Sequence, residues 1–274
     1  MEIKEPSVEL IPYTGNVVEH VAKCARVCYN KESGDDEKTY KNLIKQGHLS
    51  MFRHATYYAA VPVNKFIELP YFFNIHTGAY LVPGIEIIKG KENFYVAYNG
   101  NYALDNSMTD LLEPYLVSPE EFEKYDIARN LMRYTFRIVT QNCTAKELNR
   151  VSPNNIAELS SRRVHMNAIC KPWWMKDIKP ENKWIIDDLD KTSLYLQACS
   201  KAFDTYDRLI SLGVPKEDAR GVLPLDTATT CIYTYSIEEW RHIIKLRTDK
   251  SSHKNCQIIA DLIKRKLKEL GYKI

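Results

Sequence analysis

The sequence predicts an α+β fold in which helices flank a central antiparallel or mixed sheet, within a single domain spanning residues 1–274. Stretches with apolar residues three or four apart, which indicate helices, occur near both ends of the chain. Between them lie stretches rich in β-branched and aromatic residues, which indicate strands. The chain shows no internal repeat, low-complexity tract or linker, so one mixed domain is the simplest organisation.

The first quarter of the chain predicts two helices and a strand. Residues 16–29 read NVVEHVAKCARVCY, with apolar residues at helical spacing. Residues 34–47, GDDEKTYKNLIKQG, predict a second helix that begins at the aspartates and ends before the last glycine. HATYYAAVPV, at 54–63, is β-prone and predicts a strand that stops near its second-to-last residue, a proline.

The middle of the chain predicts short elements. Residues 64–100 are β-prone pieces broken by prolines and glycines, and NFYVAYNGN, at 93–101, is the best strand among them. A helix is expected at 102–113. RYTFRIVT, at 133–140, alternates in the manner of a half-buried strand, and TAKELNR then predicts a short helix.

The last third predicts mainly helices. A long amphipathic helix covers 190–212 and is closed by Gly213, after which PKEDARGVL predicts a short helix with proline at its first position. TTCIYTY, at 229–235, predicts a strand. Ser236 and Glu239 form a capping box that begins the next helix, and a final amphipathic helix covers 254–270.

Composition excludes several classes of protein. Of the 274 residues, 45% are hydrophobic and 27% are charged, as in globular proteins that fold without disulfides or metal ions. A net charge of +3 is too small to indicate a nucleic-acid or membrane partner, so we expect neither. No apolar run approaches the roughly 18 residues that span a bilayer. Because the stretch MEIKEPSVELIPY is unlike a signal peptide, we expect a cytoplasmic protein.

The seven cysteines are odd in number and scattered along the chain. Cys24 and Cys28 lie four apart with no second pair nearby, which does not match a zinc site. We therefore expect reduced thiols and no metal site.

One short stretch concentrates residues that bind anions. Residues 149–163 read NRVSPNNIAELSSRR and contain three arginines. Glu158, Ser160 and Arg162 alternate, so in an extended chain they face one way. Guanidinium groups and a hydroxyl that converge on one point suit a phosphate dianion, because arginine binds phosphate through two parallel hydrogen bonds. A polar surface turn would have the same composition, and the stretch alone does not decide between the two.

Three further segments carry similar chemistry. DARGVLPLDT, at 218–227, contains Arg220 within a short helix. WRHIIKLRTDKSSH, at 240–253, combines four further Lys or Arg side chains and two histidines with a buried apolar face. GHLSMFRHATYY, at 47–58, places histidines and a serine at the start of a strand. Each of these histidines can equally be a structural residue.

Together the four segments resemble the flavin-dependent thymidylate synthases. GHLSMFRH matches the first block of that family, DARGVLP its Ala-Arg-x-Val-Leu-Pro block, and EWRHIIKLRTDKSSH its closing block. RVSPNNIAELSSRR occupies the place of the family's Arg-His-Arg signature, whose histidine and second arginine are Val151 and Ser152 here. Residues 64–127 are expected to be an insertion that only longer relatives carry.

The resemblance implies the fold of that family and a methyltransferase activity. A methylene group would pass from methylenetetrahydrofolate to C5 of dUMP, and NADPH would reduce the product through FAD. The cofactor carries the difficult chemistry in such an enzyme, and the protein orients and charges the site. The resemblance also implies a homotetramer whose active sites form across subunits.

The resemblance assigns site residues by their positions in the family's motifs. It implies that Arg247 and Arg150 are catalytic. The implied dUMP-binding residues are Glu147, Arg150, Glu158, Ser160, Ser161, Arg162, Arg220 and Arg247. The implied FAD-binding residues are His48, Ser50, Arg53, His242 and His253.

Two alternatives share the same nucleotide-binding residues. The chain could modify C5 of another pyrimidine nucleotide, or it could be an FAD-independent paralogue that binds a pyrimidine nucleotide without catalysis. The kept arginines argue against a decayed surface but do not separate these hypotheses. Nucleic-acid binding through KRKLKEL is a lesser alternative, because basic and apolar residues there alternate as on the exposed face of a packed helix.

Overall fold

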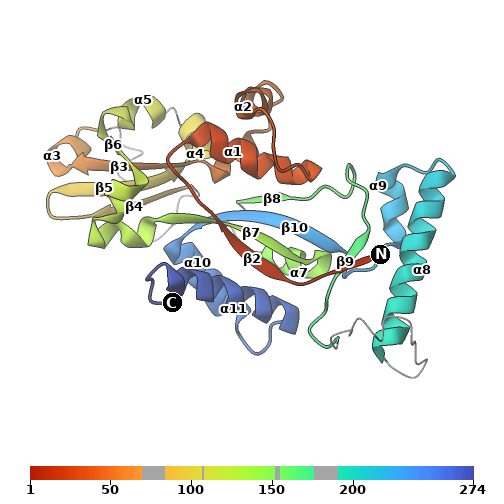
Figure 1. Cartoon of the computed structure of the whole chain (residues 1–274). Helices are drawn as coiled ribbons and strands as arrows, with labels where there is room; N and C mark the ends of the chain where they lie inside the picture. The colour runs from red at the N-terminus through yellow and green to blue at the C-terminus, as the bar shows by residue number, and fades with distance from the viewer. Residues whose placement is uncertain (70–83, 107, 152–154, 176–190) are drawn as a thin grey trace.

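The computed structural model describes residues 1–69, 84–106, 108–151, 155–175 and 191–274. It confirms the α+β class: helices cover two four-stranded antiparallel sheets, and a two-stranded parallel sheet lies beside them (Figure 1). Each helix in these ranges is too short or too polar to reach across a bilayer. The seven cysteines are free thiols, as expected.

The first sheet is built around two long neighbouring strands. β7 (Arg133–Gln141) and β10 (Ala228–Ser236) pair antiparallel over their whole lengths. β2 (Ser7–Ile11) flanks β7 and β8 (Ile156–Glu158) flanks β10, which gives the order β2-β7-β10-β8. Every residue of β10 is buried, because this strand of β-branched and aromatic residues lies inside the sheet. The expected alternation appears in β7, where Phe136 is fully buried and its neighbour Arg137 is partly exposed.

Three helices cover one face of this sheet (Figure 1): α7 (Asn142–Leu148), α10 (Ile237–Arg247) and α11 (Lys254–Glu269). The predicted capping box begins α10, since Ser236 accepts from the Glu239 amide and the Glu239 carboxylate accepts from the Ser236 amide. Trp240 then points into the main core with 1% of its surface exposed, and its indole N–H donates to a backbone carbonyl 3.1 Å away.

The opposite face carries N-terminal elements. These are α1 (Val17–Arg26), the 3-10 turns η1 (Val27–Tyr29) and η2 (Leu49–His54), and α2 (Asp36–Lys45) between them. A small core of α1, η1, β2, β8 and β10 side chains holds this layer. None of the α2 side chains is buried, so α2 lies over the molecule as an outer helix. Both predicted helices are therefore confirmed.

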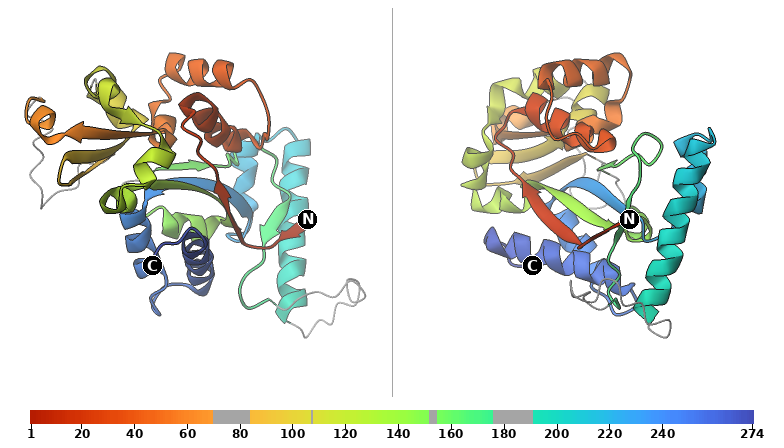
Figure 2. Two further views of the ribbon diagram at one scale, coloured as in Figure 1. Left: turned by 60° about the vertical axis from the view of Figure 1, so that its left-hand side comes forward. Right: turned by 45° about the vertical axis from the view of Figure 1, so that its right-hand side comes forward.

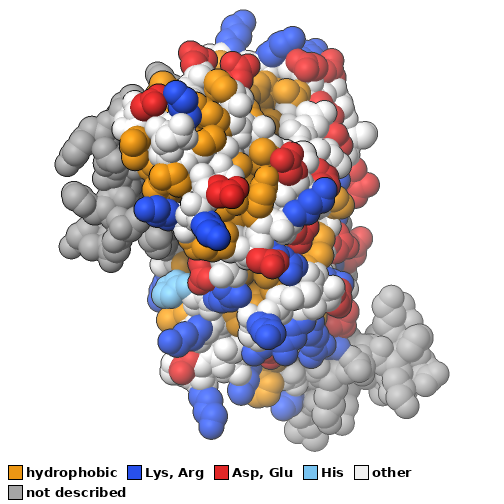
Figure 3. Space-filling model, turned by 90° about the vertical axis from the view of Figure 1, so that its left-hand side faces the viewer, with side chains coloured by type: hydrophobic (Ala, Val, Ile, Leu, Met, Phe, Trp, Pro, Cys, Tyr) orange, Lys and Arg blue, Asp and Glu red, His pale blue; other side chains and the backbone are white. Residues whose placement is uncertain are grey.

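The second sheet contains the described part of the 64–127 segment. Its order is β4 (Ile85–Lys89), β5 (Asn93–Asn99), β3 (Thr56–Pro62) and β6 (Leu116–Val117). Its helices and turns are α3 (Val63–Phe66), α4 (Gly100–Asp105), α5 (Met108–Leu112), η4 (Glu113–Tyr115), α6 (Pro119–Glu123) and η5 (Asp126–Leu131). The single helix expected at 102–113 is therefore two helices. Figure 3 views this side, where hydrophobic side chains lie among scattered charges.

A third group of elements stands at the far end of the first sheet (Figure 2). β1 (Glu2–Lys4) pairs in parallel with β9 (Ala168–Cys170), and the long α8 (Lys191–Ser211) packs against α9 (Lys216–Ala219) and η7 (Arg220–Val222). Gly213 has φ 89° after α8, where a side chain would be strained, so the predicted stop is confirmed. The proline before α9 is its N-cap rather than its first residue.

A buried polar network joins the two large sheets. Arg133 of β7 donates to the Thr56 hydroxyl at 3.3 Å and to the Thr234 carbonyl at 3.3 Å, and its guanidinium lies 3.6 Å from Glu239. Glu86 of β4 accepts a 2.8 Å hydrogen bond from the Ser236 hydroxyl. Burial and the nearby Glu239 carboxylate raise the pKa of Glu86 to about 7.

This pKa predicts a pH-dependent stability. The folded protein keeps a proton on Glu86 between pH 4.5, the ordinary pKa of this group, and about 7, whereas the unfolded chain has lost it. Stability should therefore fall as pH rises through that window, by at most about 1.4 kcal/mol per pH unit. We expect Glu86→Gln to flatten the fall in a series of urea titrations. Glu92→Gln, at an exposed position in the same segment, should leave it unchanged, and an equal slope in Glu86→Gln would contradict the assignment.

Candidate anion-binding cavity

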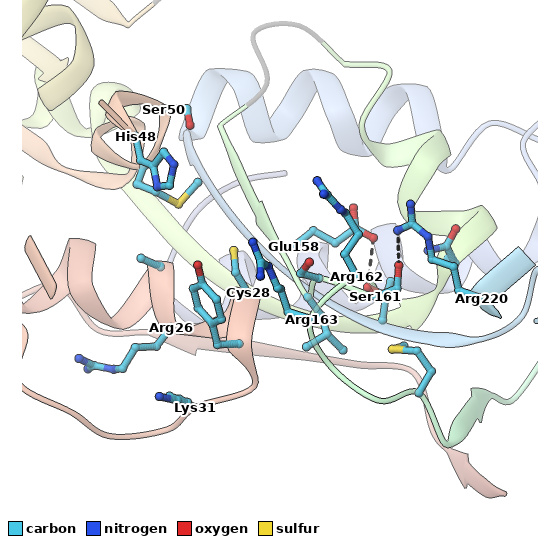
Figure 4. A pocket seen from close by; sticks show the side chains of 18 of the residues that line it. Arg26, Cys28, Lys31, His48, Ser50, Glu158, Ser161, Arg162, Arg163 and Arg220 are labelled. Carbon is cyan, nitrogen blue, oxygen red and sulfur yellow. Dashed lines mark hydrogen bonds between the residues drawn. The ribbon is translucent and has the colours of Figure 1, made fainter. Parts of the chain in front are cut away.

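A large cavity opens between the N-terminal layer and the segment that follows β8. Its volume is about 1240 Å³. One wall comes from the end of α1, from η1, and from the side of α2 and the start of η2. The other comes from residues 158–163 and 220–225 (Figure 4). Of the described residues that line it, seven are Lys or Arg and two are Asp or Glu, so the cavity is strongly basic although the whole chain is nearly neutral.

The segment after β8 turns instead of staying extended. β8 ends at Glu158, and the amides of Arg163 and Val164 both donate to the Ser160 carbonyl at 3.0 and 2.9 Å. The Ser160 amide donates to the Cys28 carbonyl at 3.1 Å, which fixes the turn against η1. The expectation that these residues alternate along an extended chain is therefore wrong. The turn still presents its side chains to the cavity.

Two arginines of the cavity are held in fixed orientations. Arg220 donates from Nη1 to the Ser161 hydroxyl at 2.8 Å and from Nε to the Glu217 carbonyl at 2.9 Å. Arg162 donates from Nε to the Glu217 carboxylate at 2.9 Å. Each guanidinium keeps further N–H groups for another acceptor. Figure 4 shows Ser161, Arg162 and Arg220 side by side on one wall.

Glu158 lies deeper in the same wall. It accepts a 3.1 Å hydrogen bond from the Thr229 hydroxyl. Burial raises the pKa of this carboxyl above its ordinary value, while the Thr229 hydrogen bond and the nearby Lys146 charge act in the opposite direction. The carboxylate is therefore a hydrogen-bond acceptor that is partly withdrawn from water and close to the arginines.

The structure divides the predicted site residues into two groups. Seven line the cavity: His48, Ser50, Glu158, Ser160, Ser161, Arg162 and Arg220. The other six do not line it: Arg53, Glu147, Arg150, His242, Arg247 and His253.

Most of the second group lies where α7, α10 and α11 meet. Arg247 donates from Nη2 to the Glu147 carbonyl, and Arg150 follows α7 with its side chain exposed. His253 is the N-cap of α11 and His242 is exposed on α10. Arg53 lies elsewhere, at the junction of the sheets, where its carbonyl accepts from Arg133. A single chain therefore does not bring Arg150 and Arg247 to the cavity.

Sequence reasoning missed the wall supplied by α2. Lys38, Asn42 and Gln46 line the cavity and are spaced four apart, so they lie on one face of that helix. This polar face was visible in the sequence, but nothing local showed that it would meet residues more than a hundred positions away. Lys146 and Cys28 were missed for the same reason.

The residues present fit a flavin only in part. His48 and Ser50 face the cavity and could hold a cofactor there. Val151 belongs to the main hydrophobic core and is 6% exposed, so the signature position it occupies does not reach the cavity. Ser152 lies outside the described residues. In this chain a cofactor in the cavity would therefore be held by the wall that carries His48 and Ser50.

The structure combines a mixed α+β fold with a basic, arginine-lined cavity. Residues 127–270 match the model of the thymidylate synthase complementing protein family, and the chain belongs to this family. The match begins where the 64–127 segment ends. That this segment is an insertion, and that residues 1–274 form one domain, remain predictions.

Known relatives are distant in sequence. The chain is 24% identical to the flavin-dependent thymidylate synthase of Aquifex aeolicus, over 90% of this chain and 92% of that protein. It is 28% identical to that of Synechocystis sp. over 46% of this chain. The chain spans between 39% and 61% of the length of three of the curated relatives that it matches, the Synechocystis protein among them. A crystal structure of the UMP/dUMP methylase PolB from Streptomyces cacaoi bound with 5-Br UMP has a TM-score of 0.48 and 17% identity, covering 98% of this chain and 92% of that one.

Proposed function

We propose that the chain is an enzyme that methylates C5 of a pyrimidine nucleoside monophosphate, with dUMP as its substrate. The observation that carries the proposal is the fixed Ser161–Arg220 pair beside Arg162, in a cavity with an excess of cationic side chains. A phosphate dianion can accept hydrogen bonds from both guanidinium groups and from the serine hydroxyl. Glu158 then lies where it could accept from the N–H edge of a pyrimidine or from a sugar hydroxyl.

The catalytic assignments require a second copy of the chain. Arg150 and Arg247 lie outside the cavity in one copy, although they are proposed as catalytic residues. We propose that the protein works as a homotetramer in which these arginines, with Glu147, reach the cavity of a neighbour. Arg150, which is exposed beyond α7, is free to make such a contact.

The cofactor of the proposed enzyme is FAD, with NADPH and methylenetetrahydrofolate as co-substrates. When bound, FAD would supply the reduction that turns a transferred methylene into a methyl group. The residues proposed to hold it are His48 and Ser50, with Arg53, His242 and His253 as further contacts where copies meet. The work of this chain's own residues is to bind the phosphate, to orient the pyrimidine and to surround both with positive charge.

A specific observation favours a second candidate. Val151 is a core residue, although the resemblance places the histidine of the family's signature at this position. A polar contact that the resemblance implies for a flavin is therefore absent from the cavity. This favours an FAD-independent paralogue that binds a pyrimidine nucleotide, and a C5-modifying enzyme for another pyrimidine nucleotide would share the same phosphate site.

The visible absorption spectrum separates the candidates. The purified protein would be incubated with FAD, desalted and measured with and without dUMP, and dUMP binding would be followed independently by calorimetry. For the methyltransferase we expect a retained flavin band that NADPH bleaches and dUMP perturbs. A colourless protein that still binds dUMP would favour the paralogue, and a protein that binds no pyrimidine nucleotide would contradict both.

A further inference from the structure

One acidic residue, Glu217, contacts both arginines of the phosphate site and has no assigned role. Glu217 lies on α9, half-exposed, with 47% of its side-chain surface accessible. Its carboxylate accepts from Arg162 Nε at 2.9 Å, and its backbone carbonyl accepts from Arg220 Nε at 2.9 Å. The same residue therefore engages two guanidinium groups that are 58 positions apart in the chain.

The helix α9, which carries Glu217, is fixed by packing against α8. Ala219 is 1% exposed and packs in a core with Phe203 and Tyr206 of α8, which fixes the helix from below. Lys216 also reaches the turn, donating to the Arg163 carbonyl at 3.4 Å. The turn after β8 is thus tied to α9 at Arg162 and Arg163 and to the adjoining η7 at Ser161.

The geometry of each guanidinium shows what these contacts achieve. When Nε is occupied by Glu217, the Nη1 and Nη2 groups of Arg162, which lines the cavity, remain as donors for another acceptor. Arg220 likewise uses Nε on the Glu217 carbonyl and Nη1 on Ser161, which leaves Nη2 uncommitted by these bonds. Arginine side chains lose substantial rotamer freedom when they are fixed, so holding them beforehand lowers the cost of binding an anion.

We propose that Glu217 is a positioning residue for the phosphate of the nucleotide substrate, acting through its carboxylate to orient Arg162 toward the cavity. This inference rests on the proposed function, because it takes the anion to be the dUMP phosphate. Glu217 carries a negative charge close to that anion, so by charge alone its removal should strengthen binding. If Glu217 positions the arginine, its removal should instead weaken binding. The direction of the change in dUMP affinity therefore separates the two effects.

The test measures dUMP affinity by calorimetry for the full-length protein and three variants. Glu217→Ala should weaken binding severalfold, up to about fivefold, the cost of losing an ion pair between two half-exposed side chains. Glu217→Gln keeps an oxygen acceptor for Arg162 and should recover most of that loss. Asp218→Asn removes the same charge from the next residue, whose carboxylate makes no hydrogen bond or ion pair with the described residues, and should leave affinity equal or slightly higher.

The outcomes separate the inference from the proposed function. If wild type binds dUMP and both Glu217 variants bind it as tightly or more tightly, positioning is wrong. If Glu217→Gln is as weak as Glu217→Ala, the acceptor role of the side chain is also wrong. Failure of the wild type to bind any pyrimidine nucleotide would overturn the proposed function itself. Because Glu217 is half-exposed, unchanged thermal melting of all variants should confirm that the fold is intact.

Discussion

Replacing Arg220 with alanine is expected to weaken dUMP binding about 100-fold, the loss of two charged hydrogen bonds at a partly exposed site. The substitution removes the guanidinium that would contact the phosphate, and it also releases Ser161, whose hydroxyl accepts from Arg220 Nη1 at 2.8 Å. Arg220 is exposed at the surface of the cavity, so the fold should not depend on it. Calorimetric titration with dUMP and thermal melting together measure both effects.

Two further variants sharpen this prediction. Arg220→Lys keeps the charge but cannot bond Ser161, the Glu217 carbonyl and a phosphate together, so it should recover only a small part of the affinity. Arg208→Ala removes an exposed cation on α8, outside the cavity, and should have little effect. If Arg220→Ala and Arg208→Ala lower the affinity equally, the effect is one of overall charge and the phosphate assignment is wrong.

Local patterns were sufficient to predict most helices and strands. The capping box at Ser236, the spacing of apolar residues in α11 and the glycine after α8 are all read from neighbouring residues, and each was confirmed. The turn at Ser160 was missed because it is fixed by a hydrogen bond to the Cys28 carbonyl. A contact between residues 132 positions apart leaves no local signal.

The candidate site shows the same limit more strongly. Motif spacing correctly grouped Ser161, Arg162 and Arg220, because those residues come from two segments that pack directly together. It placed Arg247 in the same group, although α10 lies on the other face of the sheet from α1 and α2. A sequence motif shows which residues occur together in a family. It does not show whether those residues meet within one folded chain.

Val151 illustrates how burial changes the reading of a motif. Because the resemblance places a histidine of the family's signature here, a Val151→His substitution would be expected from the sequence to tighten FAD binding. The structure places Val151 in the main core, directly after α7, where its amide donates to the Leu148 carbonyl. A histidine there would have to be buried without a defined partner, at a cost of about 1–3 kcal/mol. The substitution would therefore test core packing rather than flavin binding.

The largest effect on stability is expected at Arg133. Its side chain is 3% exposed and lies between the two sheets, where it contacts Thr56, Thr234 and Glu239. Arg133→Met keeps much of the apolar volume but leaves Glu239 without its buried cation, beside Glu86. Breaking a buried ion pair by removing one partner costs about 3–5 kcal/mol, because the remaining charge stays buried without compensation. Urea denaturation at neutral pH measures this loss.

Arg137→Met is the matched control on the same strand. Arg137 is 37% exposed and lies 3.7 Å from Glu9, which is 64% exposed, so this pair is a surface ion pair that should contribute less than about 1 kcal/mol. An equal loss in the two variants would show that Arg133 does not hold the sheets together. If Arg133 does hold them, Arg133→Met combined with Glu86→Gln should recover part of the lost stability, because the second change removes a neighbouring carboxyl that Arg133 no longer stabilises in its charged form. The contact between the 64–127 segment and the first sheet would then depend on the Arg133 cation offsetting the charges of Glu86 and Glu239.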